Sequence, residues 1–105
     1  MIRQQSFVIL TGLFLALASA AQAEITFSGG DGSTAANAII IEGAAGSSDG
    51  VASEYDWIAR NRPGAEVLGQ ALVQDGDRIY DLLTLRVDGR EEDLYFDITG
   101  FFGNF

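Results

Sequence analysis

The side chains available for chemistry in this sequence are carboxylates, hydroxyls and phenols, because it contains no His, Cys or Lys. Without imidazoles or thiolates, zinc and copper sites of ordinary composition cannot form, and neither can Ser-His or Cys-His nucleophile pairs. The sequence therefore predicts no cofactor and no metal site. Any catalysis would have to depend on paired acids.

Asp81 is the carboxylate with the strongest functional interpretation. It falls in the β-rich run 78–87, and the register derived below places it on the aliphatic face of a sheet. A buried carboxylate is costly unless it is paired, and its pKa rises if it is not. Asp81 could act as an acid or anchor a ligand group. Alternatively, the sheet twist leaves its tip at the rim, or Arg78, Arg86 or a backbone amide satisfies it.

A hydrolase built on carboxylates would need a second acid, and Asp97 is the candidate partner for Asp81. The derived register points these two side chains to opposite faces of the sheet, which counts against a shared site. Asp31 lies in a glycine-rich run that lacks both the Lys of a phosphate loop and the alternating acids of a calcium loop. We interpret that run as turn chemistry.

Three aromatic residues are candidates for contact with a partner: Trp57, Tyr80 and Tyr95. Trp57 lies off the apolar stripe expected for its helix, and Trp is enriched at binding hot spots. Alternatively, it packs under the segment 25–27. Tyr80 and Tyr95 would lie on the sheet face away from the helix, which is too apolar to be open to water. Either the first strand and the glycine-rich arm cover that face, or it binds another protein or a second copy.

One helix and a small sheet must position these side chains. The spacing of residues 51–62 predicts a helix that Pro63 ends. Its expected buried stripe consists of Val51, Tyr55, Ile58, Ala59 and Arg62. Before it, the apolar run 38–41 predicts a short strand.

Three β-rich runs after the helix, 67–74, 78–87 and 94–99, predict an antiparallel meander. Asp75-Gly76 and Asp88-Gly89 separate them, and Asp-Gly is a strong hairpin signal. The chain is thus expected to form an α+β domain: a strand, one helix, then the three-stranded meander, with the helix packed on one sheet face.

The two turns also predict which residues pair. Two-residue loops at the Asp-Gly dipeptides place Leu72 opposite Ile79 and Leu83 opposite Leu94. Nearly all large aliphatic side chains then share one face: Leu68, Leu72, Ile79, Leu83, Leu85, Leu94, Phe96 and Ile98. Phe101 or Phe102 is expected to fold back and close the core beneath the helix.

The first 23 residues have the features of a cleaved export signal. Arg3 supplies a positive charge, an apolar stretch follows, and Ala21-Gln22-Ala23 offers the small residues that signal peptidase requires. We expect cleavage before Glu24 and a periplasmic or extracellular protein. The predicted organisation is a signal peptide at 1–23, an N-terminal arm or short strand at 24–37, and the domain at 38–105.

The remainder of the chain is strongly acidic. All 15 Asp and Glu lie in residues 24–105, against five Arg, which leaves a charge of −10. Such a charge argues against binding nucleic acid or an anionic membrane surface, since both are polyanions. We expect no stable membrane insertion, and a monomer or weak homodimer whose partner, if it has one, is a protein.

The segment from Trp57 to Gly100 resembles PepSY-type domains, which are small exported bacterial modules. The resemblance rests on Arg62-Pro63-Gly64, on Tyr80-Asp81, on Val87-Asp88-Gly89 and on the run 95–100. It implies a non-enzymatic binding or inhibitory role. Residues 24–105, with their ending at 96–103, also look like a family of small secreted bacterial proteins of unknown function.

Composition and resemblance together favour an exported, acidic binding or interaction module that is not an enzyme. Two alternatives stay open. One is a small carboxylate-based hydrolase, and the other is a structural envelope protein with no specific ligand.

Overall fold

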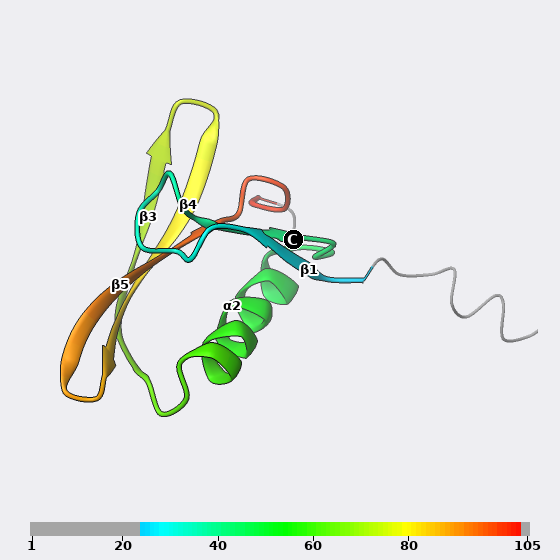
Figure 1. Ribbon diagram of the computed structural model, residues 1–105. Coiled ribbons are helices and arrows are strands. Elements are labelled where there is room, and N and C mark those ends of the chain that lie inside the picture. Colours follow the sequence, from blue (N-terminus) through cyan, green and yellow to red (C-terminus); the bar gives the residue numbers. More distant parts are fainter. Residues whose placement is uncertain (1–23, 104–105) are drawn as a thin grey trace, which may run out of the picture.

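The computed structural model describes residues 24–103, which form one helix and a five-stranded mixed sheet (Figure 1). The elements in chain order are β1 (Thr26–Gly29), β2 (Ile39–Glu42), α2 (Ser47–Asn61), β3 (Glu66–Asp75), β4 (Arg78–Val87) and β5 (Arg90–Asp97). The predicted α+β class is confirmed, and β1 and β2 widen the meander to five strands. The expected export signal at 1–23 lies outside the described residues.

The N-terminal strands extend the sheet rather than cover it. The strand order is β1-β2-β5-β4-β3, with β2 parallel to β5 and the other neighbours antiparallel. Ile39 and Ile41 alternate inward from β2 and are almost fully buried. The loop before β2 also pairs with β5, because Tyr95 N–H donates to Gly32 O at 2.7 Å. The alternative in which the first strand covers the far sheet face is therefore wrong.

The two hairpins differ in how well the turn signals predicted them. The β4–β5 register is as predicted, with Leu83 opposite Leu94. The β3–β4 register is shifted, because the turn consists of Gly76-Asp77 rather than Asp75-Gly76. Gly76 has a φ of +61°, which suits the first central position of a type II′ turn.

The shift changes which residues pair, and a β-bulge changes which β3 residues face the core. Leu72 lies opposite Asp81 instead of Ile79. The register shifts between Val67 and Gly69, so Val67 packs against the core, while Leu68 is 38% exposed. The predicted core position of Leu68 is wrong because a bulge inserts one unpaired residue and reverses the side-chain alternation.

The buried face of α2 also differs from the predicted stripe. Val51 and Tyr55 are exposed, and the buried residues are Gly50, Ser53, Glu54 and Ile58. The cause is a long-range contact: a Cβ at position 50 would lie 2.0 Å from a ring atom of Phe101. The Phe101 ring therefore occupies the space that a side chain at position 50 would need. Phe101 folds back onto the core, as predicted.

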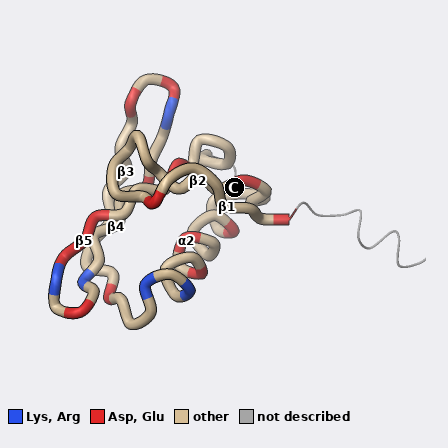
Figure 2. The backbone as a smooth tube through the Cα atoms, in the orientation of Figure 1, with Lys and Arg blue, Asp and Glu red and all other residues tan. Residues whose placement is uncertain are grey.

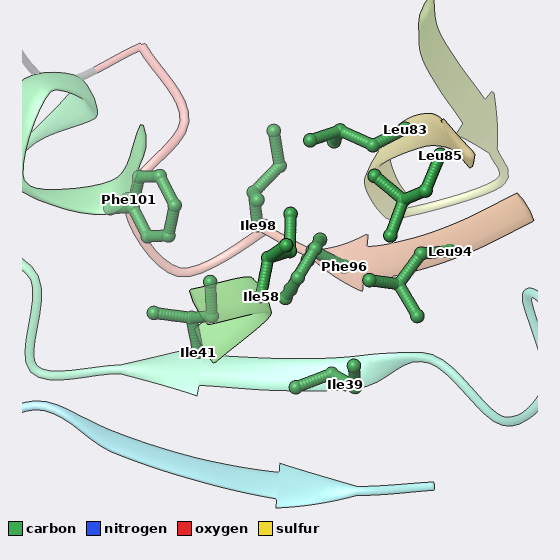
Figure 3. Close-up of a cluster of buried hydrophobic side chains, with 9 residues drawn as sticks. All are labelled: Ile39, Ile41, Ile58, Leu83, Leu85, Leu94, Phe96, Ile98 and Phe101. Carbon is green, nitrogen blue, oxygen red and sulfur yellow. The ribbon is translucent and has the colours of Figure 1, made fainter. Parts of the chain in front are cut away.

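The hydrophobic core lies between α2 and the sheet (Figure 3). Nine buried side chains form it: Ile39, Ile41, Ile58, Leu83, Leu85, Leu94, Phe96, Ile98 and Phe101. Burying each such side chain contributes about 1.5–3 kcal/mol. Within the part of the chain described, no helix is long and apolar enough to span a membrane.

Candidate functional site

Two acidic side chains meet in the interior between α2 and β4. Glu54 comes from the buried face of the helix and is 1% exposed, and Asp81 comes from the core face of β4 and is 3% exposed. Gln70 Nε2, on β3, donates to both carboxylate oxygens of Asp81 at 2.8 Å. The sheet and the helix thus hold a pair of acids together beside a neutral amide.

The surroundings of Glu54 favour the protonated form of its carboxyl group. Burial raises its pKa from an ordinary value of 4.5 to about 9, and the hydrogen bond and charge of Asp81 add to this rise. Its Oε1 atom is buried and accepts no hydrogen bond from any residue in 24–103. Most buried polar atoms in proteins have a partner, so this free acceptor requires an explanation.

No arginine in residues 24–103 forms an ion pair with Glu54 or Asp81. The four ion pairs found among the described residues are Arg60–Asp56, Arg62–Glu92, Arg78–Asp97 and Arg86–Glu66. The alternative in which Arg78 or Arg86 satisfies Asp81 is therefore wrong. Figure 2 shows how the acidic residues recur along the tube with few basic ones between them.

A pocket of about 130 Å³ opens beside the acid pair. Glu54, Asp81 and Gln70 form its polar part, together with Ser47. Five apolar side chains complete the lining: Val51, Leu72, Ile98, Phe101 and Phe102. An apolar wall with a few converging polar groups is typical of binding sites.

Exposed apolar side chains surround the mouth of this pocket. Leu72 is 57% exposed, and Val51 and Phe102 are also exposed. We call Val51, Leu72 and Phe102 the apolar rim. Exposed apolar groups gathered in one place commonly mark an interaction surface.

Larger hollows of about 250–550 Å³ lie elsewhere in residues 24–103, and those described are not lined by Glu54 or Asp81. One of about 550 Å³ lies beside the β4–β5 turn, and one of about 370 Å³ lies between β1 and α2. Neither is lined by the orphan Glu54 oxygen, the only buried side-chain N or O atom without a partner in residues 24–103. No three acidic side chains in those residues converge on a point that could hold a metal ion.

Asp97 lies on the opposite face of the sheet from Asp81, as the register predicted. Arg78 Nε and Nη2 donate to its Oδ2 at 3.0 and 2.6 Å, and the backbone N–H and hydroxyl of Thr99 donate to its Oδ1. Burial tends to raise the pKa of Asp97, but the bonds from Thr99 and Arg78 outweigh burial and lower it. The two aspartates do not share a site.

The three aromatic candidates are packed within the fold. Trp57 stands edge-on to Phe96, with centroids 5.8 Å apart, and the Arg62 guanidinium lies 5.4 Å from its ring centroid. Its predicted position off the buried helix face is wrong, because that face is rotated toward it. Tyr80 is 8% exposed and stands edge-on to Tyr95 at 6.3 Å.

Sequence reasoning missed Glu54. The signal lay in Trp57 and Ile58, which follow Glu54 by three and four positions and so share its helix face.

Comparison with known proteins found no similarity: no family model, curated protein or solved structure matches the chain.

Proposed function

We propose that this chain is an exported, acidic binding module without enzymatic activity, and that it binds a partner protein through the pocket beside Glu54 and Asp81. The observation that carries the proposal is the apolar rim around a pocket with a free buried acceptor. The resemblance of residues 57–100 to PepSY-type domains supports the same role.

The geometry of the acid pair favours binding over hydrolysis. The Asp81 carboxylate lies within hydrogen-bonding reach of Glu54, which is closer than the separation of roughly 5 Å or more that two-carboxylate glycosidases use. A pocket of about 130 Å³ is also smaller than the roughly 300–1,000 Å³ of a typical small-molecule site. It has room for one side chain of a partner rather than for a substrate chain.

The binding role predicts that the rim controls partner capture. Leu72→Ser removes an exposed rim residue, and Leu68→Ser removes an exposed leucine of the same strand that does not line the pocket. We expect cross-linking in envelope extract to give a partner band that Leu72→Ser abolishes and Leu68→Ser preserves. A band that is indifferent to both changes would contradict this site.

The hydrolase alternative is tested directly on the same protein. We expect no turnover of chromogenic glycosides or peptides at any pH. Turnover that disappears in Asp81→Asn would overturn the non-enzymatic role.

Export is tested by the mass of the protein recovered from cells. We expect an N-terminus at Glu24 after cleavage behind Ala23. Recovery of the intact 1–105 chain still embedded in the membrane would contradict export.

A further inference from the structure

The acid pair differs from Asp97, the other buried charged residue in 24–103, because it has no cationic partner. Asp97, the other buried aspartate, has Arg78 as its counter-charge. Neither Glu54 nor Asp81 has an arginine or a lysine as a counter-charge. The ion pairs of residues 24–103 lie elsewhere, and the chain contains no Lys. The pair is therefore an anionic site for which residues 24–103 provide no cation.

We propose that the pocket binds the primary ammonium group of a lysine side chain on a partner protein, which takes the place of the proton between Glu54 and Asp81. The inference rests on the proposed function and names its ligand. A lysine has a flexible apolar stem that lies along apolar surface while its ammonium reaches a charged group. Val51, Leu72 and Phe101 provide that surface along the pocket wall.

The size and acceptors of the pocket favour an ammonium over a guanidinium. The pocket has a volume of about 130 Å³. For comparison, a cavity of roughly 150 Å³ holds one benzene molecule. An ammonium donates three hydrogen bonds in adjustable directions, whereas a guanidinium has five donors in a rigid plane. Asp81 already accepts two bonds from Gln70, so the Glu54 Oε1 atom is the principal open acceptor.

The charge of the protein supports a basic partner. Residues 24–105 carry a charge of −10, which attracts cations over a distance and increases their association rate. A bare metal ion fits the pocket less well, because five apolar side chains line it and only two acids are present.

Exchange of a proton for an ammonium makes binding depend on pH. Among residues 24–103, Asp81 is the charged group that faces Glu54; β3 contributes neutral Gln70, and the segment after β5 contributes Ile98, Phe101 and Phe102. Binding releases one proton while Glu54 is protonated. The association constant should therefore rise by up to about tenfold per pH unit between pH 6 and 8, where an ammonium keeps its charge.

The test uses three small probes of equal stem length: n-butylammonium, n-butylguanidinium and 1-butanol. Calorimetry in two buffers of different ionisation enthalpy measures proton release, and amide chemical shifts of Glu54 and Asp81 locate the site. We expect n-butylammonium to bind best, with a dissociation constant on the order of millimolar for so small a ligand. Its binding should release close to one proton at pH 7.

Two variants separate the acid pair from the apolar wall. Glu54→Gln should abolish proton release and weaken n-butylammonium binding at least tenfold, while leaving 1-butanol binding unchanged. Asp81→Asn should also weaken n-butylammonium binding and leave 1-butanol binding unchanged, and melting curves confirm that both variants fold.

Each other outcome overturns the inference. Stronger binding of n-butylguanidinium would show that the ligand is an arginine. Equal, pH-independent binding of 1-butanol would show that the pocket takes a neutral group, which leaves the proposed function intact. Failure of all three probes, together with partner capture that ignores Leu72→Ser, would overturn the proposed function as well.

Discussion

Asp81 on β4 and Asp97 on β5 lie on opposite faces of the sheet. The surroundings on the two faces shift the pKa of a buried carboxyl group in opposite directions. Asp97 accepts hydrogen bonds from Arg78 and Thr99, which lower its pKa. On the other face, Asp81 lies against Glu54, whose pKa rises to about 9. All three side chains are at most 5% exposed; burial is the main cause of the raised pKa of Glu54, whereas at Asp97 the hydrogen-bond donors outweigh it. A buried acid with a fixed cation is structural, and a buried acid pair without one can exchange its proton.

The far face, with Tyr80 and Tyr95, should be the more important of the two for stability. We expect Tyr80→Ser combined with Tyr95→Ser to lower the free energy of unfolding by about 4 kcal/mol or more, because Tyr80 is buried and packs edge-on against Tyr95. Urea denaturation measures this loss. Unchanged stability together with loss of a dimer would instead make this face an interface between copies.

The next largest effect should come from the Asp97 site. Asp97→Asn weakens the bonds to Arg78 and Thr99 and should cost about 2–3 kcal/mol at pH 7. Because folding lowers the pKa of Asp97, its contribution is present above the unfolded value of 3.8 and is lost as the pH falls below it. Wild type and variant should therefore converge in acid.

An exposed acid of the same strand provides the control for that change. Asp93 lies on β5 and accepts a bond from the Thr84 hydroxyl at 3.1 Å. We expect Asp93→Asn to change the free energy of unfolding by less than about 0.5 kcal/mol. A loss as large as that of Asp97→Asn would show that general charge, rather than the fixed ion pair, stabilises the fold.

The acid pair should have the opposite pH dependence. The folded protein keeps a proton on Glu54 up to about pH 9, whereas the unfolded chain releases it near its ordinary value of 4.5. The folded state thus binds more protons in this window, and stability falls as pH rises, by up to about 1.4 kcal/mol per pH unit. Glu54→Gln should flatten this slope and make the protein more stable at pH 8. A parallel slope in the variant would contradict a protonated Glu54.

The sequence predicted one member of the acid pair and missed the other for a physical reason. Asp88-Gly89 sets the β4–β5 register, and that local signal suffices to place Asp81 on the core face. The buried face of α2 depends instead on Phe101, which packs on Gly50 from 51 residues further along the chain. Local periodicity placed the larger Val51 and Tyr55 on the predicted buried face. That predicted face therefore did not include Glu54.

Turn chemistry likewise predicted the number of strands in the meander better than their pairing. Asp75-Gly76 and Gly76-Asp77 are both acceptable hairpin loops, and the choice between them shifts the pairing without changing which face most residues occupy. The bulge at Leu68 has no such signal, because it depends on how β3 fits across the twisted sheet.

The ionisation of Glu54 in the folded protein tests the central claim most directly. Carboxyl ¹³C chemical shifts, assigned by comparison with Glu54→Gln, can follow this one group from pH 4 to pH 10. We expect Glu54 to stay protonated through neutral pH and to titrate with a pKa of about 9. Titration near its ordinary value of 4.5 would contradict this expectation, since the pair would then hold no proton for a lysine to replace.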